Sequence, residues 1–307
     1  TGYVGQISLA QMAFSGISAY LVSKVTTEGP LRIPLPFSDY QLAIVPDMPF
    51  PLPIIFGGLV AMLVGVVVAL PALRVRGVNL AIVTLAFAVA VDKVVFANGS
   101  VNGGMSGAAV SAPKSIVEAR EVRFKIFGIS AGDGMQPNPM TTVFVLIVVV
   151  ILGYAVANLR RSATGRLMLA LRSNERAAAA AGVNVSATKI LAFAFSAFIA
   201  GVGGAVIAYK TGNVTTDKFD YTKSLSYLTF AYLGGIASVY GAIIAGMMAA
   251  GGLMFTIMSE EMGVPSEFTL ILGGLGLIIT AIANPEGVAG ATRSTLLAAR
   301  SRLGPRF

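Results

Sequence analysis

The sequence predicts an all-α fold, a polytopic bundle of transmembrane helices that forms a single membrane domain across residues 1–307. The chain is 55% hydrophobic and only 12% charged, with a mean hydropathy of +0.80, whereas an average soluble domain carries about 25% charged residues. Apolar runs of about 20 residues recur, and each is long enough to cross a hydrocarbon core of roughly 30 Å. A transmembrane barrel would show short alternating segments instead.

Eight transmembrane spans are predicted along the chain. Their approximate bounds are Tyr3–Val25, Ile54–Leu73, Val78–Ala97, Thr141–Leu159, Lys189–Tyr209, Ser224–Ile236, Val239–Met258 and Glu267–Ala283. The sixth span is short and ends at Gly234–Gly235, which favours a broken or re-entrant helix.

The charges of the connecting segments predict the orientation in the membrane. With both chain ends inside the cell, the inner segments Arg74–Gly77, Arg160–Lys189 and Asn284–Phe307 hold 12 basic and two acidic residues, whereas the outer segments hold nine basic and 11 acidic residues. Lys and Arg concentrate in cytoplasmic loops, so we expect both ends to be cytoplasmic. Two long outer loops follow from this orientation. Residues 26–53 are proline-rich and expected to be extended and irregular, and in residues 98–140 the stretch Ser115–Lys125 is expected to form a short helix or hairpin.

The residue types that are missing exclude several functions. The chain contains no histidine, cysteine or tryptophan, which removes disulfides, thiol nucleophiles, imidazole bases and the usual zinc ligands. No GxxxxGK[ST] phosphate loop occurs, so ATP is not bound by that route. The net charge of +8 follows from the inner loops and does not indicate nucleic acid. We therefore expect no catalytic residues, no metal and no cofactor in this chain.

The segment Arg160–Asn184 is a charged connection between two apolar spans, and its composition favours a helix. It carries five arginines and one glutamate. Ser162 or Thr164 can cap a helix that runs from about Leu167 to Ala181, and Gly182 can end it. One interpretation is an amphipathic helix on the membrane surface, with its arginines near lipid phosphates. The other interpretation is a helix that docks into a cytoplasmic subunit and transmits its movement to the membrane spans. On either interpretation Arg172 and Glu175, three residues apart, can pair on one helix face.

The first span is unusually polar. Gln6, Ser8 and Gln11 lie in it, and Gln11, Ser15 and Ser18 share one helix face. Hydrogen bonds to a neighbouring helix, worth about 0.6–2 kcal/mol each, are one explanation. The other is a wall of a solute path. We therefore name Gln6, Gln11, Ser15 and Ser18 as candidate path residues.

Two further patterns have a structural and a functional interpretation. Asp92 and Lys93 lie near the outer end of the third span, where an ion pair or a snorkelling lysine explains them, with a role in gating or coupling as the alternative. The fifth span carries a small residue at every fourth position: Ser196, Ala200, Gly204 and Ala208. This repeat predicts close helix packing.

Several stretches together resemble the membrane subunits of branched-chain amino acid ABC importers, the LivM-type permeases. The most specific is GRLMLALRSNERAAAAAGVNVSATKILAFAFSAFIAGVGGA at Gly165–Ala205. The others are GYVGQISLAQMAFSGISAY at Gly2–Tyr20, RGVNLAIVTLAFA at Arg76–Ala88, NGGMSG at Asn102–Gly107, LGGIASVYGA at Leu233–Ala242 and NPEGVAG at Asn284–Gly290. They cover nearly the whole chain in the order expected of the family.

The resemblance implies a permease subunit of the bacterial cytoplasmic (inner) membrane, with no ATPase site of its own. It implies three kinds of partner besides the lipid bilayer: two cytoplasmic ABC ATPase subunits that bind ATP and Mg, a second and paralogous permease, and an extracytoplasmic solute-binding protein. It also implies that the loop 160–188 carries a coupling helix. Its ATPase-coupling residues map to Gly165, Arg166, Arg172, Asn174, Glu175 and Gly182.

The sequence departs from the family pattern in two places. The family normally has one or more spans before the segment that starts this chain, and Ala10 and Asn79 stand where glycine and an aromatic residue are common. A urea or short-amide permease therefore stays open as an alternative solute class. An ATP-independent channel or secondary transporter is a second alternative, although the spans lack the buried acidic residues that ion coupling generally uses.

Overall fold

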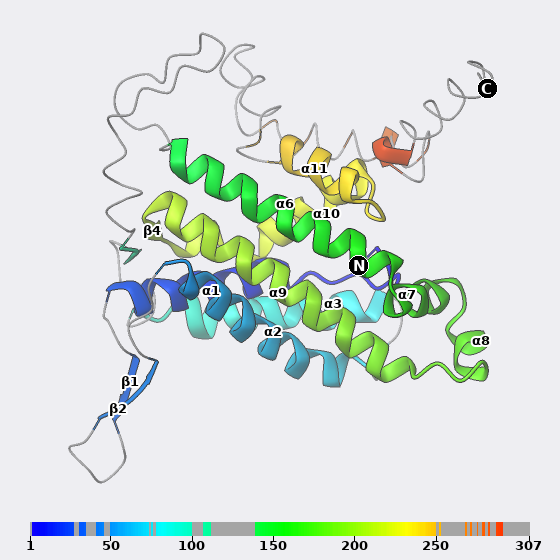
Figure 1. Cartoon of the computed structure of the whole chain (residues 1–307), viewed down its shortest axis with the longest axis horizontal. Helices are drawn as coiled ribbons and strands as arrows, with labels where there is room; N and C mark the ends of the chain where they lie inside the picture. Colours follow the sequence, from blue (N-terminus) through cyan, green and yellow to red (C-terminus); the bar gives the residue numbers. More distant parts are fainter. Residues whose placement is uncertain are drawn as a thin grey trace.

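The computed structural model shows a bundle of long helices with short strands at one end (Figure 1). It describes residues 2–27, 31–34, 41–45, 50–73, 75, 78–99, 107–111, 139–249, 252, 268, 271, 275, 278, 279, 282 and 287–290. The helices are α1 (Gln11–Thr27), α2 (Leu52–Ala72), α3 (Val78–Val91), α6 (Pro139–Arg161), α7 (Ala163–Ser173), α8 (Glu175–Ala180), α9 (Val185–Thr211), α10 (Tyr221–Gly234) and α11 (Val239–Met248). A π-helix, η1 (Asp92–Phe96), extends α3, and a 3-10 turn, η4 (Thr216–Lys218), precedes α10.

Four helices in the described part of the chain are long and apolar enough to cross a membrane. They are Leu52–Ala72, Asn79–Phe96, Thr142–Arg161 and Val185–Thr211. The second to fifth predicted spans are thereby confirmed as helices, and the all-α class with them. The total of eight spans stays a prediction.

The first predicted span is wrong in its first third. Residues 2–5 form turns and residues 6–10 have no regular structure, so α1 begins only at Gln11. The helix is largely buried among its neighbours. It therefore forms part of the bundle core, and its polar face is turned toward other helices.

The last three predicted spans are shifted, shorter than predicted or only partly described. α10 begins three residues before the predicted span and ends at Gly234. The next residue, Gly235, has a φ of 112° that is open to glycine, as the sequence indicated. α11 ends at Met248 and Ala249 is extended, so the predicted span to Met258 is wrong where the structure describes it. Most of Glu267–Ala283 lies outside the described residues. Those described within it are helical and exposed: Phe268, Ile271, Leu275, Ile278, Ile279 and Ile282.

Two small sheets lie at the end of the bundle opposite α7. In the loop predicted to be extended and irregular, β1 (Leu31–Pro34) and β2 (Gln41–Val45) pair as an antiparallel hairpin. These residues are therefore extended, as predicted, but the prediction that they are irregular is wrong. The second sheet pairs β3 (Ala108–Ala109) with β4 (Asn213–Val214). The predicted element at Ser115–Lys125 lies outside the described residues. Of the predicted inner segments, only residue 75 of Arg74–Gly77 and residues 287–290 of Asn284–Phe307 are described.

Helices α1, α2 and α9 approach so closely at several glycines that a larger side chain would not fit at those positions. A Cβ added at Gly204 of α9 would collide with the backbone of Ser15 in α1, and one at Gly65 of α2 would meet Ala197 of α9. Dispersion contacts between such closely approaching backbones drive helix association in lipid, where the hydrophobic effect between helices is lost. The repeat of small residues on α9 is thereby confirmed as a packing stripe.

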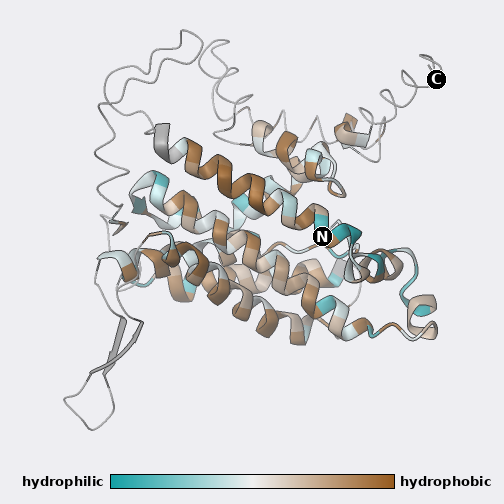
Figure 2. Cartoon of the chain, in the orientation of Figure 1, coloured by the Kyte–Doolittle hydropathy of each residue, from teal (hydrophilic) through white to brown (hydrophobic). Residues whose placement is uncertain are grey.

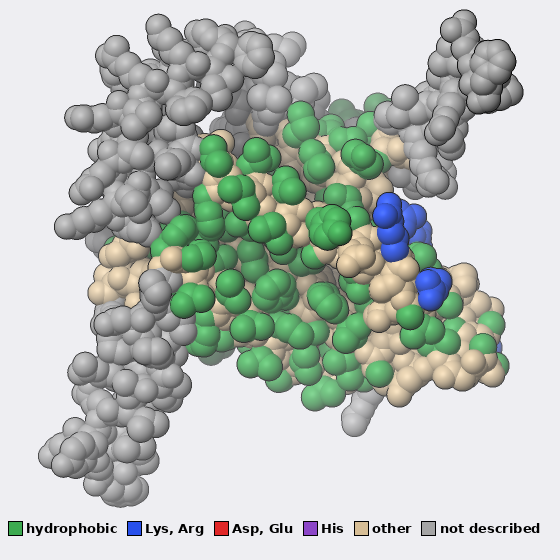
Figure 3. Space-filling view, in the orientation of Figure 1, with side chains coloured by type: hydrophobic (Ala, Val, Ile, Leu, Met, Phe, Trp, Pro, Cys, Tyr) green, Lys and Arg blue, Asp and Glu red, His purple; other side chains and the backbone are tan. Residues whose placement is uncertain are grey.

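The outer surface of the bundle is apolar. Leu63, Val67, Leu146, Val150 and Tyr154 are among the exposed large side chains of α2 and α6, and hydrophobic residues dominate these helices in Figure 2. Figure 3 shows an apolar surface over most of this face, with Lys and Arg gathered at the end where α7 lies. This distribution fits helices that face hydrocarbon along their length and water or lipid headgroups at the α7 end.

Candidate functional site: the charged segment and its contacts

The charged segment Arg160–Asn184 folds as two short helices. α7 begins after Ser162, whose Oγ accepts a hydrogen bond from the Gly165 amide at 3.2 Å. Ser162 is therefore the N-cap, as the sequence allowed, and Thr164 lies inside the helix. The chain leaves the second helix at Gly182, where φ is +86°, a conformation that glycine adopts without strain.

The predicted single helix is wrong because Asn174 interrupts it. Its backbone is extended, with φ −159°, and its side chain accepts hydrogen bonds from the amides of Arg176 and Ala177 at 3.0 and 3.1 Å. An asparagine that caps the next helix offers the backbone an alternative to continuing the first one. Arg172 and Glu175 consequently lie on different helices, so the prediction that they share one helix face is wrong.

A partly buried ion pair joins α8 to the start of α9. The Nζ of Lys189 lies 2.9 Å from Oε1 of Glu175, and the Lys189 side chain is only 4% exposed, against 30% for Glu175. A cavity of about 240 Å³ opens beside the pair and is lined also by Leu73, Arg176 and Ser186. The ion pair fixes the position of α8 relative to the membrane-spanning helix α9, because a buried ammonium without a counter-ion is costly.

The N-terminal segment, residues 2–10, lies against α7. Nη1 of Arg172 donates a hydrogen bond to the carbonyl oxygen of Gly2 at 2.9 Å, and the Arg160 guanidinium lies 6.0 Å from the centre of the Tyr3 ring, at the outer limit of a cation–π contact. Gly5 has φ +72°, and a Cβ there would lie 3.2 Å from Cγ of Arg172. Backbone and side chains of this segment are therefore fitted to α7.

The N-terminal segment and the first turn of α1 are hydrogen-bonded to other helices of the bundle. The amide of Leu9 donates to Oγ1 of Thr84 in α3 at 3.0 Å, and the amide of Met12 donates to Oγ of Ser224 in α10 at 3.1 Å. Gly2 packs closely on the Ile236 carbonyl between α10 and α11. The first amides of α1 have no partner within their own helix, so the Ser224 hydroxyl, which accepts from Met12, also serves as part of its cap.

The candidate path residues fall into two groups. Gln11 and Ser15 hydrogen-bond to α9, with Nε2 of Gln11 donating to Ser196 Oγ at 3.1 Å and Ser15 Oγ donating to the Ala200 carbonyl at 2.8 Å. Ser18 is fully buried where α1 meets Gly57 of α2. Gln6 lies in the N-terminal segment and is partly exposed. The geometry of Gln11, Ser15 and Ser18 accords with interhelical packing.

Several residues of this region escaped sequence reasoning. Lys189 was treated as the edge of a span, and Thr84 and Ser224 as ordinary polar residues within spans. A buried polar side chain in an apolar helix is a signal for a specific partner. The partner itself could not be named, because Thr84 and Ser224 are 75 and 212 residues from the amides that they bind.

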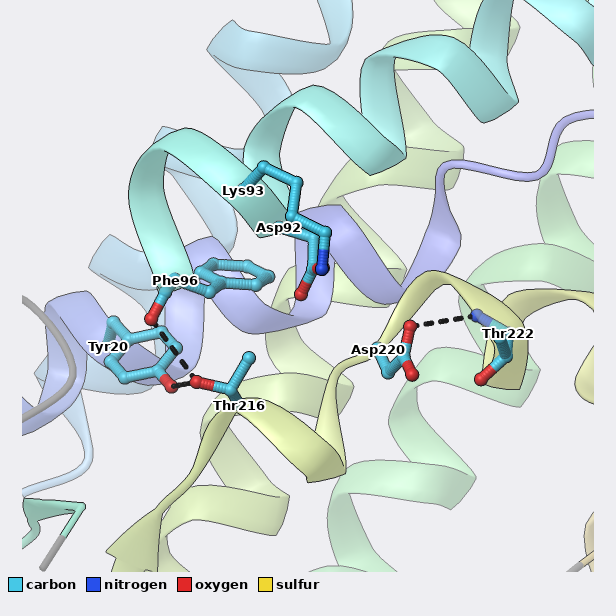
Figure 4. A network of polar contacts seen from close by, with 7 residues as sticks. All are labelled: Tyr20, Asp92, Lys93, Phe96, Thr216, Asp220 and Thr222. Carbon is cyan, nitrogen blue, oxygen red and sulfur yellow. Dashed lines mark hydrogen bonds and ion pairs between the residues drawn. The ribbon is translucent and has the colours of Figure 1, made fainter. Parts of the chain in front are cut away.

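A second polar cluster lies at the opposite end of the bundle (Figure 4). The Tyr20 hydroxyl lies 3.4 Å from Thr216 Oγ1, which donates to the Phe96 carbonyl at 3.2 Å. Asp92 forms an ion pair with Lys93, Nζ to Oδ2, at 3.1 Å, as the sequence indicated. Nearby, burial and then the charge of Lys223 lower the pKa of Lys218. This cluster joins α1, η1 and the start of α10.

Comparison with known proteins identifies a matching family and several related permeases. Residues 1–281 match the family described as "Branched-chain amino acid transport system / permease component". The high-affinity branched-chain amino acid permease LivM of Escherichia coli is 31% identical over 250 residues, which cover 78% of this chain and 57% of the relative. LivM of Salmonella typhimurium is 30% identical over the same shares. The fructose import permease FrcC of Rhizobium meliloti is 27% identical over 54% of this chain and 46% of its own.

The chain thus spans somewhat more than half the length of its LivM relatives. No solved structure matches it significantly.

Proposed function

This chain belongs to the family of branched-chain amino acid transport permease components, and on that premise we propose that it forms the translocation path of an ABC importer for branched-chain or related amino acids. ATP hydrolysis takes place in separate subunits, two ABC ATPases that bind ATP and Mg. A second, paralogous permease and an extracytoplasmic binding protein complete the importer. Both ends of the chain and the α7–α8 end of the bundle face the cytoplasm, in the inner membrane of a bacterium.

One observation carries this proposal most directly: the charged pair of helices α7 and α8 stands between two membrane-spanning helices and is bonded to the N-terminal segment. α7 continues from α6 after a single residue, Ser162, and α8 is fixed to α9 by the Glu175–Lys189 pair. Energy that enters the permease from a cytoplasmic ATPase needs such a docking element. Gly165, Arg166, Arg172, Asn174, Glu175 and Gly182 are its proposed coupling residues.

We propose a route by which movement of α7 reaches the helices. Arg172 binds the carbonyl of Gly2 in the N-terminal segment, and the Leu9 amide of the same segment binds Thr84 of α3. The amide of Met12, in the first turn of α1, binds Ser224 of α10. A displacement of α7 is therefore transmitted to α1, α3 and α10 together, because α1 begins where the N-terminal segment ends. Gln6, in the segment, and Gln11, Ser15 and Ser18, on α1, move with it as proposed parts of the path.

Replacing Arg172 with alanine is expected to uncouple the importer. The change removes the charge-assisted hydrogen bond to the Gly2 carbonyl, a contact that contributes about 1.5–3 kcal/mol, while α7 keeps its cap and its apolar contacts. We expect fewer amino acids imported per ATP hydrolysed, measured as uptake and phosphate release in the same proteoliposomes. Arg176→Ala, an exposed arginine on α8, is the matched control. If Arg172→Ala and wild type import the same number of amino acids per ATP hydrolysed, the Arg172–Gly2 contact is not part of the coupling route.

Reconstitution tests the proposed function itself. The chain is purified in mild detergent, its co-purifying subunits are identified, and the assembly is placed in proteoliposomes with its binding protein. We expect ATP-dependent uptake of leucine, isoleucine or valine. Uptake that proceeds without the ATPases and stops when an ion gradient is collapsed would identify a secondary transporter instead.

A further inference from the structure

The carboxylate of Asp92 is buried and only half satisfied. Asp92 is the first residue of η1 and is 4% exposed. Its Oδ2 faces Lys93, but Oδ1 has no hydrogen-bond partner among the residues that the structure describes. An unsatisfied buried charged oxygen is costly, and an ionisable residue in a membrane-spanning helix points to function by default. A donor from outside the chain would complete its coordination.

The backbone around Asp92 is also unusual. Residues 92–96 form a π-helix, in which the Ala97 amide bonds to the Asp92 carbonyl at 2.9 Å. Such single π-turns insert an extra residue, turn side chains away from their regular positions and are frequent at functional sites. Figure 4 shows the Asp92 side chain leaving this turn in the direction of the segment that carries Asp220.

The surroundings of Asp92 favour a cation over an anion. A second carboxylate, that of Asp220, lies near enough to Lys93 to interact with it electrostatically. Lys93, whose side chain is 69% exposed, therefore has two carboxylates beside it, those of Asp92 and Asp220. A positively charged group that reaches Oδ1 is attracted by both carboxylates.

The ion pair between Asp92 and Lys93 indicates which kind of cation would bind. Oδ2 already accepts a primary ammonium, that of Lys93, at 3.1 Å. A carboxylate has about four acceptor positions, so Oδ1 can take a second ammonium of the same kind. An amino acid carries this group, whereas urea, short amides and sugars do not.

We propose that Asp92 binds the α-ammonium group of an amino acid as the solute passes the end of the bundle opposite α7. The inference rests on the proposed function and narrows it, because it selects amino acids from the solutes open to this family. Asp92 is then a specificity-determining residue of the path, and Lys93 is its resting counter-ion.

Asp92→Asn in the complete importer tests this inference. The amide keeps the shape and removes the charge, so we expect ATP-driven uptake of radiolabelled leucine to fall about 10- to 100-fold, the range of one charge-assisted hydrogen bond. Asp217→Asn makes the same charge change at an exposed position and is expected to keep wild-type uptake. Co-purification of all subunits establishes that each variant assembles.

A double variant separates solute binding from a structural ion pair. If Asp92 serves only to neutralise Lys93, then Asp92→Asn with Lys93→Gln removes both charges and restores uptake. Solute binding predicts that the double variant stays as defective as Asp92→Asn alone. Restored uptake in the double variant, or unchanged uptake in Asp92→Asn, overturns the inference and leaves the proposed function supported by wild-type uptake. If the wild-type importer takes up no amino acid with ATP, the proposed function itself fails.

Discussion

Replacing Glu175 with arginine is expected to destabilise the protein by about 3–5 kcal/mol, the usual cost of breaking a buried ion pair. The Lys189 side chain is 4% exposed and has the Glu175 carboxylate at 2.9 Å. The new guanidinium would leave that ammonium buried and face it with a like charge. Thermal unfolding in detergent, followed by circular dichroism, measures the loss as a lower midpoint.

Two variants sharpen this result. Arg176→Glu reverses a charge at the next position, which is exposed, and is expected to shift the midpoint little, because surface charges contribute about 0–1 kcal/mol. Glu175→Arg with Lys189→Glu restores a pair of opposite sign and is expected to recover part of the loss. If Glu175→Arg unfolds at the wild-type midpoint, the ion pair does not hold α8 to α9.

Replacing Gly204 with alanine is expected to destabilise the bundle by about 1–3 kcal/mol, the cost of overpacking a close contact. A Cβ at this position would collide with the Ser15 carbonyl, and both partners are backbone of packed helices. The helices α1 and α9 would have to separate, which also lengthens the Ser15–Ala200 hydrogen bond of 2.8 Å.

The adjacent glycine provides a control of opposite sign. Gly203 has no atom within 4 Å of an added Cβ, so Gly203→Ala should be neutral or stabilising, since alanine favours a helix interior by about 0.5–1 kcal/mol over glycine. The two midpoints are measured side by side. Equal midpoints would show that α1 and α9 do not meet at Gly204.

The helices of the bundle were predictable because their signals are local. Apolar runs gave α2, α3, α6 and α9 to within a few residues, and the small residues of α9 indicated its packing face. The start of α1 was not predictable, because the hydroxyls of Thr84 and Ser224, which accept from the amides of Leu9 and Met12, lie far away in sequence.

The candidate site was predictable in place but not in detail. Charge alone located the α7–α8 segment, and Ser162 and Gly182 marked its ends. The break at Asn174 was missed because asparagine inside a helix and asparagine as a cap look alike in sequence. The partner of Glu175 was missed because helix spacing suggests Arg172, whereas the turn after Gly182 brings Lys189 back to α8.

The central claim is that the α7–α8 segment meets the ATPase, and site-specific cross-linking tests it most directly. The chain has no cysteine, so one introduced thiol carries a photoactivated cross-linker without background. Ala180→Cys places it on exposed α8, and Asp217→Cys places it at the opposite end of the bundle. The account predicts an adduct with the ATPase subunit from Ala180→Cys and none from Asp217→Cys. An assembled importer that yields no ATPase adduct at position 180, or yields one at position 217, would contradict it.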